Sequence, residues 1–143
     1  FVLLNPSTAD AERDDPTIRR CMAFARDWGY AALEVVNLFA WRATKPAELR
    51  QARAPVGPAN DAHLLQAAQR AGRVVLAWGS HGTLAGRDAA VCALLAEALG
   101  TLECLGLTQG GQPRHVLYLP RHARPMPYPP PWRQRIGNSQ DSG

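Results

Sequence analysis

Cysteines are few in this chain, and long apolar runs are missing. Only three cysteines, Cys21, Cys92 and Cys104, occur in 143 residues, and they stand far apart among apolar neighbours. Such cysteines suit buried thiols of a reducing compartment rather than a disulfide framework or a zinc site. No apolar run approaches the ~20 residues that span a bilayer, and no signal-peptide pattern is visible. We therefore expect a cytoplasmic protein that needs no metal or other cofactor.

Lysine is almost absent, and acidic residues are absent from one long stretch. Fifteen of the sixteen Lys and Arg residues are arginine, the cation that binds phosphate bidentately. No acid lies between Glu103 and Asp141, whereas the same stretch contains Arg114, Arg121, Arg124, Arg133 and Arg135. This distribution favours a polyanionic partner, and we expect nucleic acid. A surface that merely uses arginine in place of lysine would have the same composition. The oligomeric state is not indicated.

Apolar runs alternate with helical patterns along the chain. We expect strands at about 1–4, 32–39, 74–78 and 102–107. Helices are expected at about 16–28, 60–71 and 86–99, with Asp15 capping the first and Asn60 or Asp61 capping the second. A short extended piece is expected at 116–119, and the proline-rich remainder is expected to be a tail.

The alternation predicts an α/β fold with right-handed crossovers and helices on both faces of a parallel sheet. We expect three layers, α/β/α, around four parallel strands in the order 2-1-3-4, which places Asn5 beside Asn37. One domain would cover residues 1–135, and residues 136–143 would form a disordered tail. Because the chain starts abruptly in a strand, residues upstream are expected to be missing.

Polar residues follow the first two strands, where parallel sheets of this kind bind ligands. Pro6 restricts the backbone of Asn5, whose carboxamide could orient a water molecule. An Asx-type turn that only ends the strand would look the same. Asn37 ends the second strand, and its amide offers donors and an acceptor to a flat heterocycle. It could equally bond the backbone of its own loop.

The later strand ends carry glycine, serine, arginine and histidine. The turn at Gly79 and Ser80 precedes a helix, so its N–H groups could hold a phosphate, although it matches neither common phosphate-loop pattern. Arg114 could also bind phosphate. His115 could donate a proton or hydrogen bond to a leaving group, or it could be an ordinary solvated loop histidine.

Several motifs resemble the bacterial domain-of-unknown-function family 1643. They are Leu-Asn-Pro-Ser-Thr-Ala-Asp at 4–10, Asp-Asp-Pro-Thr-Ile-Arg-Arg-Cys at 14–21, Asn-Leu-Phe-Ala-Trp-Arg-Ala-Thr at 37–44, Pro-Val-Gly-Pro-Ala-Asn-Asp at 55–61 and Gly-Gln-Pro-Arg-His-Val-Leu-Tyr at 111–118. The family name implies no activity.

A more distant similarity is to the uracil-DNA glycosylase superfamily, of the mismatch-specific uracil/thymine type. An apolar strand running into Asn5-Pro6 resembles the motif that positions the attacking water, and Asn37 occupies the place of an Asn that recognises the base edge. His115-Val116-Leu117 resembles a motif that stabilises the leaving base, but both of its prolines are missing here.

This similarity implies a uracil-DNA-glycosylase-like fold and a protein that excises or binds a flipped base in DNA. The catalytic residues would be Asn5 and His115. Substrate contacts are expected at Pro6, Ser7, Asn37, Phe39, Arg42 and Thr44, and phosphate contacts at Gly79, Ser80 and Arg114. Two alternatives remain. One is a hydrolase or transferase of free nucleosides or nucleotides, and the other is a non-catalytic module that recognises modified bases.

Overall fold

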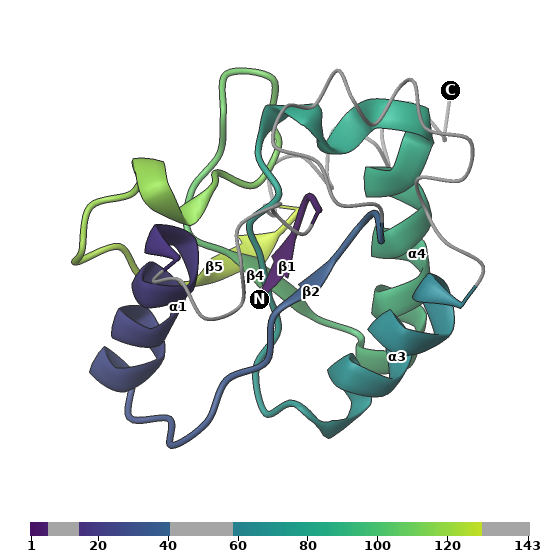
Figure 1. Ribbon diagram of the computed structural model, residues 1–143. Coiled ribbons are helices and arrows are strands. Elements are labelled where there is room, and N and C mark those ends of the chain that lie inside the picture. Colours follow the sequence, from purple (N-terminus) through teal and green to yellow (C-terminus); the bar gives the residue numbers. More distant parts are fainter. Residues whose placement is uncertain (6–14, 41–58, 130–143) are drawn as a thin grey trace.

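A computed structural model describes residues 1–5, 15–40 and 59–129 of the chain. Four of the expected substrate contacts, Pro6, Ser7, Arg42 and Thr44, lie outside these residues, as does the expected tail at 136–143. The fold is α/β, with α1, α3 and α4 packed around one sheet (Figure 1). No helix among the described residues is long and apolar enough to cross a membrane.

Within the described residues the sheet has five strands, in the order β2-β1-β3-β4-β5. Their bounds are Val36–Asn37, Val2–Leu3, Val75–Leu76, Leu102–Cys104 and Met126–Tyr128 in that order. The first four are parallel and follow the predicted order. The prediction of a purely parallel, four-stranded sheet is wrong, because β5 adds an antiparallel strand at the edge.

Strand β5 lies in the proline-rich segment that looked like a tail. Pro127 pairs with Glu103 in the outermost strand of the sheet, the position where a missing backbone donor is tolerated. Tyr128 anchors this strand, because its buried ring packs edge-on against the indole of Trp78, with 6.4 Å between the ring centroids. Aromatic packing therefore draws this segment onto the sheet.

Helix α1 (Pro16–Asp27) begins as predicted. The Thr17 backbone N–H donates to the Asp15 carboxylate at 2.8 Å, and proline occupies the first helical position. The prediction that Asn60 or Asp61 caps helix α3 (Asn60–Arg70) is wrong. Ala59 is the N-cap residue, and no side chain caps the helix. Asn60 turns instead toward β2, where it makes other hydrogen bonds.

Helix α4 (Arg87–Leu99) follows a 3₁₀ segment, η1 (Ser80–Gly86), and ends at Gly100. A second 3₁₀ segment, η2 (Val116–Tyr118), replaces the extended piece expected at 116–119, so that prediction is wrong. The His115 ring accounts for this geometry, because it accepts the N–H of Leu117 and so favours a tight turn.

Two apolar clusters cover the two faces of the sheet. One contains Leu64 of α3 and Val91 of α4, packed with the sheet side chains Val2 and Leu76. The other contains Cys21, Phe24, Leu3, Val75 and Val116, which brings α1 and η2 against the opposite face. Figure 1 shows the same division, with α1 on one side of the sheet and α3 and α4 on the other.

Candidate functional site

The carboxyl ends of the three neighbouring strands β2, β1 and β3 lie in register. Val2 of β1 pairs with Val36 on one side and with Leu76 on the other. Three residues beyond these, the chain reaches Asn5, Phe39 and Gly79 respectively. The ladder continues past the strands, since Phe39 N–H donates to the Leu4 carbonyl at 2.9 Å. The predicted polar strand ends therefore share one edge of the sheet.

Asn37 lies opposite Leu3, and this pairing decides which face it occupies. Leu3 belongs to the cluster beneath α1 and η2, whereas Val2 and Leu4 belong to the cluster beneath α3 and α4. Because paired residues share a face, Asn37 projects on the α1 side. Asn5 follows the bend at Leu4, two residues beyond the end of β1. The Asn37 side-chain amide forms no hydrogen bond with the part of the chain that the structure describes, and it is only partly buried.

His115 lies beside the turn that follows β3. The Gly79 N–H donates to the Pro113 carbonyl at 2.8 Å, which docks the 106–115 loop on the strand end. A Cβ placed on Gly79 would stand 3.7 Å from the Cβ of His115, and φ of +81° favours glycine there. The strand order and this docking together bring His115 to the same edge as Asn5 and Asn37.

The hydrogen bonding of His115 fixes which ring nitrogen carries the proton. Nδ1 accepts the backbone N–H of Leu117 at 3.2 Å, so the neutral ring carries its hydrogen on Nε2. Burial lowers the pKa of His115 below its usual 6.5, and the Asp15 carboxylate at the start of α1 partly opposes that shift. At neutral pH the residue is therefore an uncharged donor through Nε2.

The residues predicted to bind phosphate are placed less favourably. Ser80 is exposed at the first position of η1, but the N–H of Gly79 is already taken by Pro113. Arg114 donates through Nη2 to the Tyr118 carbonyl, and its aliphatic stem packs on Gly106. Arg114 thus braces its own loop, and a phosphate would have to share its guanidinium.

Phe39 and Trp78 form core around the strand ends. Phe39 is 0% exposed, so in this conformation it supports the edge and offers no face to a ligand. The Trp78 indole is also buried, and its Nε1–H donates to the Gln112 side chain at 2.9 Å. This bond ties the core to the loop that carries His115.

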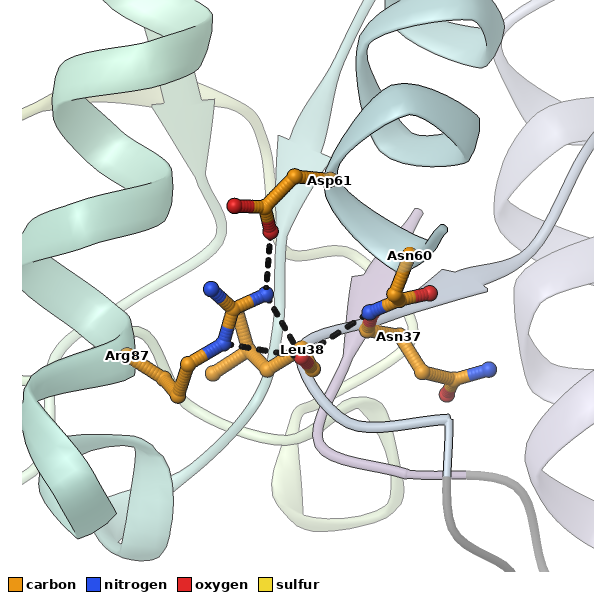
Figure 2. A network of polar contacts seen from close by, with 5 residues as sticks. All are labelled: Asn37, Leu38, Asn60, Asp61 and Arg87. Atoms are coloured by element: carbon orange, nitrogen blue, oxygen red, sulfur yellow. Dashed lines mark hydrogen bonds and ion pairs between the residues drawn. The ribbon is translucent and has the colours of Figure 1, made fainter. Parts of the chain in front are cut away.

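Sequence reasoning missed a polar network on the other side of β2 (Figure 2). The Leu38 carbonyl accepts from Arg87 Nε at 3.0 Å, from Arg87 Nη2 at 2.8 Å and from Asn60 Nδ2 at 3.0 Å. Asn60 Nδ2 also donates to the Asn37 carbonyl at 2.9 Å, and Arg87 Nη2 donates to Asp61 at 2.8 Å. The motif at 55–61 was the available signal, whereas Arg87 resembled an ordinary surface residue.

A cavity of about 300 Å³ lies at the opposite, amino-terminal end of the strands. Its walls are mostly apolar and come from the ends of α1 and α3, together with Trp28, Tyr30 and Arg73. None of the predicted site residues that the structure describes lines it. In parallel α/β sheets ligands bind at the carboxyl ends, so the polar edge is the better candidate.

The described residues contain no group of three or more His, Cys, Asp or Glu side chains that could hold a metal ion. Burial raises the pKa of the Cys21 thiol to about 11, so it is protonated and unreactive at neutral pH.

The chain was compared with known proteins at three levels. Neither the curated proteins nor the solved structures gave a significant match. The model of one family, described as a protein of unknown function (DUF1643), matches residues 1–117, which include β1 to β4 and the loop to His115. The chain therefore belongs to the DUF1643 family.

Proposed function

We propose that this protein binds a nucleobase flipped out of DNA at the carboxyl edge of β2, β1 and β3, and hydrolyses its N-glycosidic bond. The observation that carries the proposal is the convergence at this edge. Asn5 and Asn37 lie at the ends of adjacent strands, with Asn37 on the α1 side, and His115 adjoins the turn after the next strand. Two amides and a neutral imidazole suit an uncharged, hydrogen-bonding ligand such as a base.

Asn37 is the residue proposed to recognise the base. Its carboxamide presents an acceptor oxygen and a donor nitrogen, the pair needed to match the carbonyl and N–H on the edge of a uracil-like base. Once a bound base covers the Asn37 amide, an amide group left without a partner is penalised, so a base with the wrong edge is rejected. Pyrimidines with adjacent carbonyl and N–H groups are therefore the expected substrate class.

His115 is the residue proposed to stabilise the departing base. When the glycosidic bond breaks, its electron pair leaves with the base, and negative charge develops on the base carbonyl oxygens. A hydrogen bond from Nε2–H of neutral His115 would strengthen as this charge grows. The structure supports the required protonation state, because Nδ1 is an acceptor and burial lowers the pKa.

Asn5 is the residue proposed to orient the water. The sugar left behind resembles an oxocarbenium ion, so a weak nucleophile suffices and no strong base is needed. The water oxygen bonds to the anomeric carbon, and its released proton balances the charge of the departing base. Asn5 follows β1, which lies between β2 and β3 in the sheet.

Hydrolysis of free nucleosides is a second candidate, favoured by one observation. The Gly79 amide and the Arg114 guanidinium both have partners within the protein, which weakens the expected grip on the phosphates of a strand. A nucleoside has no phosphate and would need only the base contacts. DNA remains our first choice, because Arg124 is exposed in a stretch whose sequence contains no acid, and Arg121 is exposed as well, although it is paired with Asp27 at 3.5 Å.

One assay separates these proposals. The protein is incubated with oligonucleotides carrying uracil, mismatched thymine or modified pyrimidines, and alkaline cleavage detects abasic sites. Free nucleosides are tested in parallel by chromatography of the released base. Abasic sites that disappear with Asn37→Ala and His115→Ala support the first proposal, and base release from nucleosides alone supports the second. Binding without base release would show a non-catalytic recognition module.

A further inference from the structure

One backbone carbonyl at the candidate site is held unusually firmly. The Leu38 oxygen accepts three hydrogen bonds from two helices, one from Asn60 at the start of α3 and two from Arg87 at the start of α4. A backbone carbonyl ordinarily accepts one or two hydrogen bonds. The preceding carbonyl, that of Asn37, is held by the same Asn60 amide at 2.9 Å.

The arrangement carries an energetic cost. Arg87 is only 6% exposed, and a buried guanidinium loses most of its hydration. Its carboxylate partner Asp61 lies at 2.8 Å but is 58% exposed, so solvent screens part of that attraction. A strand end needs no such support, because solvent or one loop donor would satisfy the carbonyl. The cost points to a requirement for a fixed backbone at this position.

The fixed backbone belongs to Asn37. The Leu38 side chain is 0% exposed, and its N–H donates to the Leu3 carbonyl at 2.9 Å, so the residue after Asn37 is held at its side chain, amide and carbonyl. Before Asn37, the Val36 N–H donates to the Phe1 carbonyl at 2.9 Å. Figure 2 shows the Asn37 amide extending away from Arg87, on the side opposite the network.

We propose that Asn60 and Arg87 are positioning residues, which hold the Asn37 backbone so that its side-chain amide points in one direction toward the ligand. The inference rests on the proposed role of Asn37 in base recognition. The network itself does not touch the ligand, because it lies on the α3 and α4 side of the sheet and Asn37 projects on the α1 side. Its effect passes through the two carbonyls.

The first arm of the test needs no ligand. The ¹⁵N order parameter of the Asn37 side-chain amide is measured in the full chain, with its signal assigned by its loss in Asn37→Asp. We expect a value near that of rigid groups, about 0.85, and a fall below about 0.6 in Asn60→Ala and Arg87→Met. Arg87→Lys keeps the charge and one donor nitrogen, so its order parameter at Asn37 should lie between those of the original protein and Arg87→Met.

The matched control is Arg70→Met. Arg70 is also a helical arginine paired with a carboxylate, Glu34, but it is exposed and lines the cavity at the far end of the sheet. Removing the Arg70 side chain should leave the order parameter of the Asn37 amide unchanged. If Asn60→Ala and Arg87→Met fold but leave the order parameter of Asn37 at its original value, the positioning role is wrong.

The second arm measures selectivity with two defined probes, an oligonucleotide carrying one uracil and the same oligonucleotide with cytosine. Asn60→Ala and Arg87→Met should lower the uracil-to-cytosine affinity ratio by about tenfold, and should add little in an Asn37→Ala background. If Asn60 and Arg87 had only a structural role, their substitution would lower the affinity for both oligonucleotides equally. If no variant or original protein binds either probe, the proposed function fails, whereas the first arm still decides the positioning role.

Discussion

Replacing Gly82 with alanine should destabilise the protein strongly. A Cβ at this position would stand 2.0 Å from Cδ1 and 2.4 Å from Nε1 of Trp78, far inside the ~3.5–4.0 Å of a normal carbon contact. The indole cannot yield easily, because it is 1% exposed, bonded to Gln112 and packed on Tyr128. The backbone imposes no second penalty, since Gly82 does not have a positive φ.

The magnitude follows from two effects. Overpacking of a core costs about 1–3 kcal/mol. Displacement of the indole also breaks its hydrogen bond to Gln112, which contributes about 1 kcal/mol. We therefore expect Gly82→Ala to lower the free energy of unfolding by about 2–4 kcal/mol. It should also loosen the loop that holds His115, because Gln112 joins that loop to the core.

The assay is urea denaturation followed by circular dichroism, since four tryptophans complicate the fluorescence signal. Gly72→Ala is the control, because its nearest neighbour beyond the adjacent chain is Tyr30 Cε1 at 3.8 Å and its φ is not positive. That variant should change stability by less than about 1 kcal/mol. If Gly82→Ala were as stable as the control, the packing described for Trp78 would be incorrect.

Three further predictions concern the candidate site. Asn5→Ala should lower turnover by ~10²-fold or more with little loss of stability, whereas Asn5→Asp should retain activity. If Asn5→Ala instead unfolds the protein but leaves full activity per folded molecule, Asn5 is only a turn residue. Since burial lowers the pKa of His115 below 6.5, protonation favours the unfolded chain. The free energy of unfolding should therefore be highest above about pH 6.5 and fall below it. Denaturation curves of His115→Gln should show a smaller fall at acid pH. Oligonucleotide affinity should fall as salt rises, and alanine at Arg114, Arg121 and Arg124 should reduce the salt slope; an unchanged slope would exclude these contacts.

The order of the four parallel strands could be predicted from the sequence. Apolar runs such as Val74 to Trp78 alternate with helical patterns, and few topologies satisfy right-handed crossovers with the first strand at the centre. The convergence of Asn5, Asn37 and the Gly79 turn at one edge follows from the same rule, because parallel strands end together.

The fifth strand could not be predicted in the same way. Three prolines, Pro125, Pro127 and Pro129, indicate a segment without a ladder. What places the strand is the contact between Tyr128 and Trp78, whose residues are 50 positions apart in the chain. Contacts over such separations leave no periodic pattern.

Some predictions of contacts at the site were wrong for a related reason, since these contacts also join residues far apart in the chain. Asn60 matches a helix cap in sequence, but the carbonyls of Asn37 and Leu38 compete successfully for its amide. Arg87 reads as a surface residue until packing buries it against the same carbonyl. In the sequence, the Gly79 N–H looks free to bind a phosphate, because its actual partner, the Pro113 carbonyl, belongs to a loop far away in the chain.

The central claim is that the carboxyl edge of the sheet binds a base. The most direct test maps the amide and side-chain NMR signals that shift when a uracil-containing oligonucleotide is added to the ¹⁵N-labelled chain. We expect the signals of Asn5, Asn37 and the ring of His115 to shift together and to saturate at one ligand concentration. Shifts confined to Tyr30 and Arg73, at the cavity on the opposite end, would contradict it.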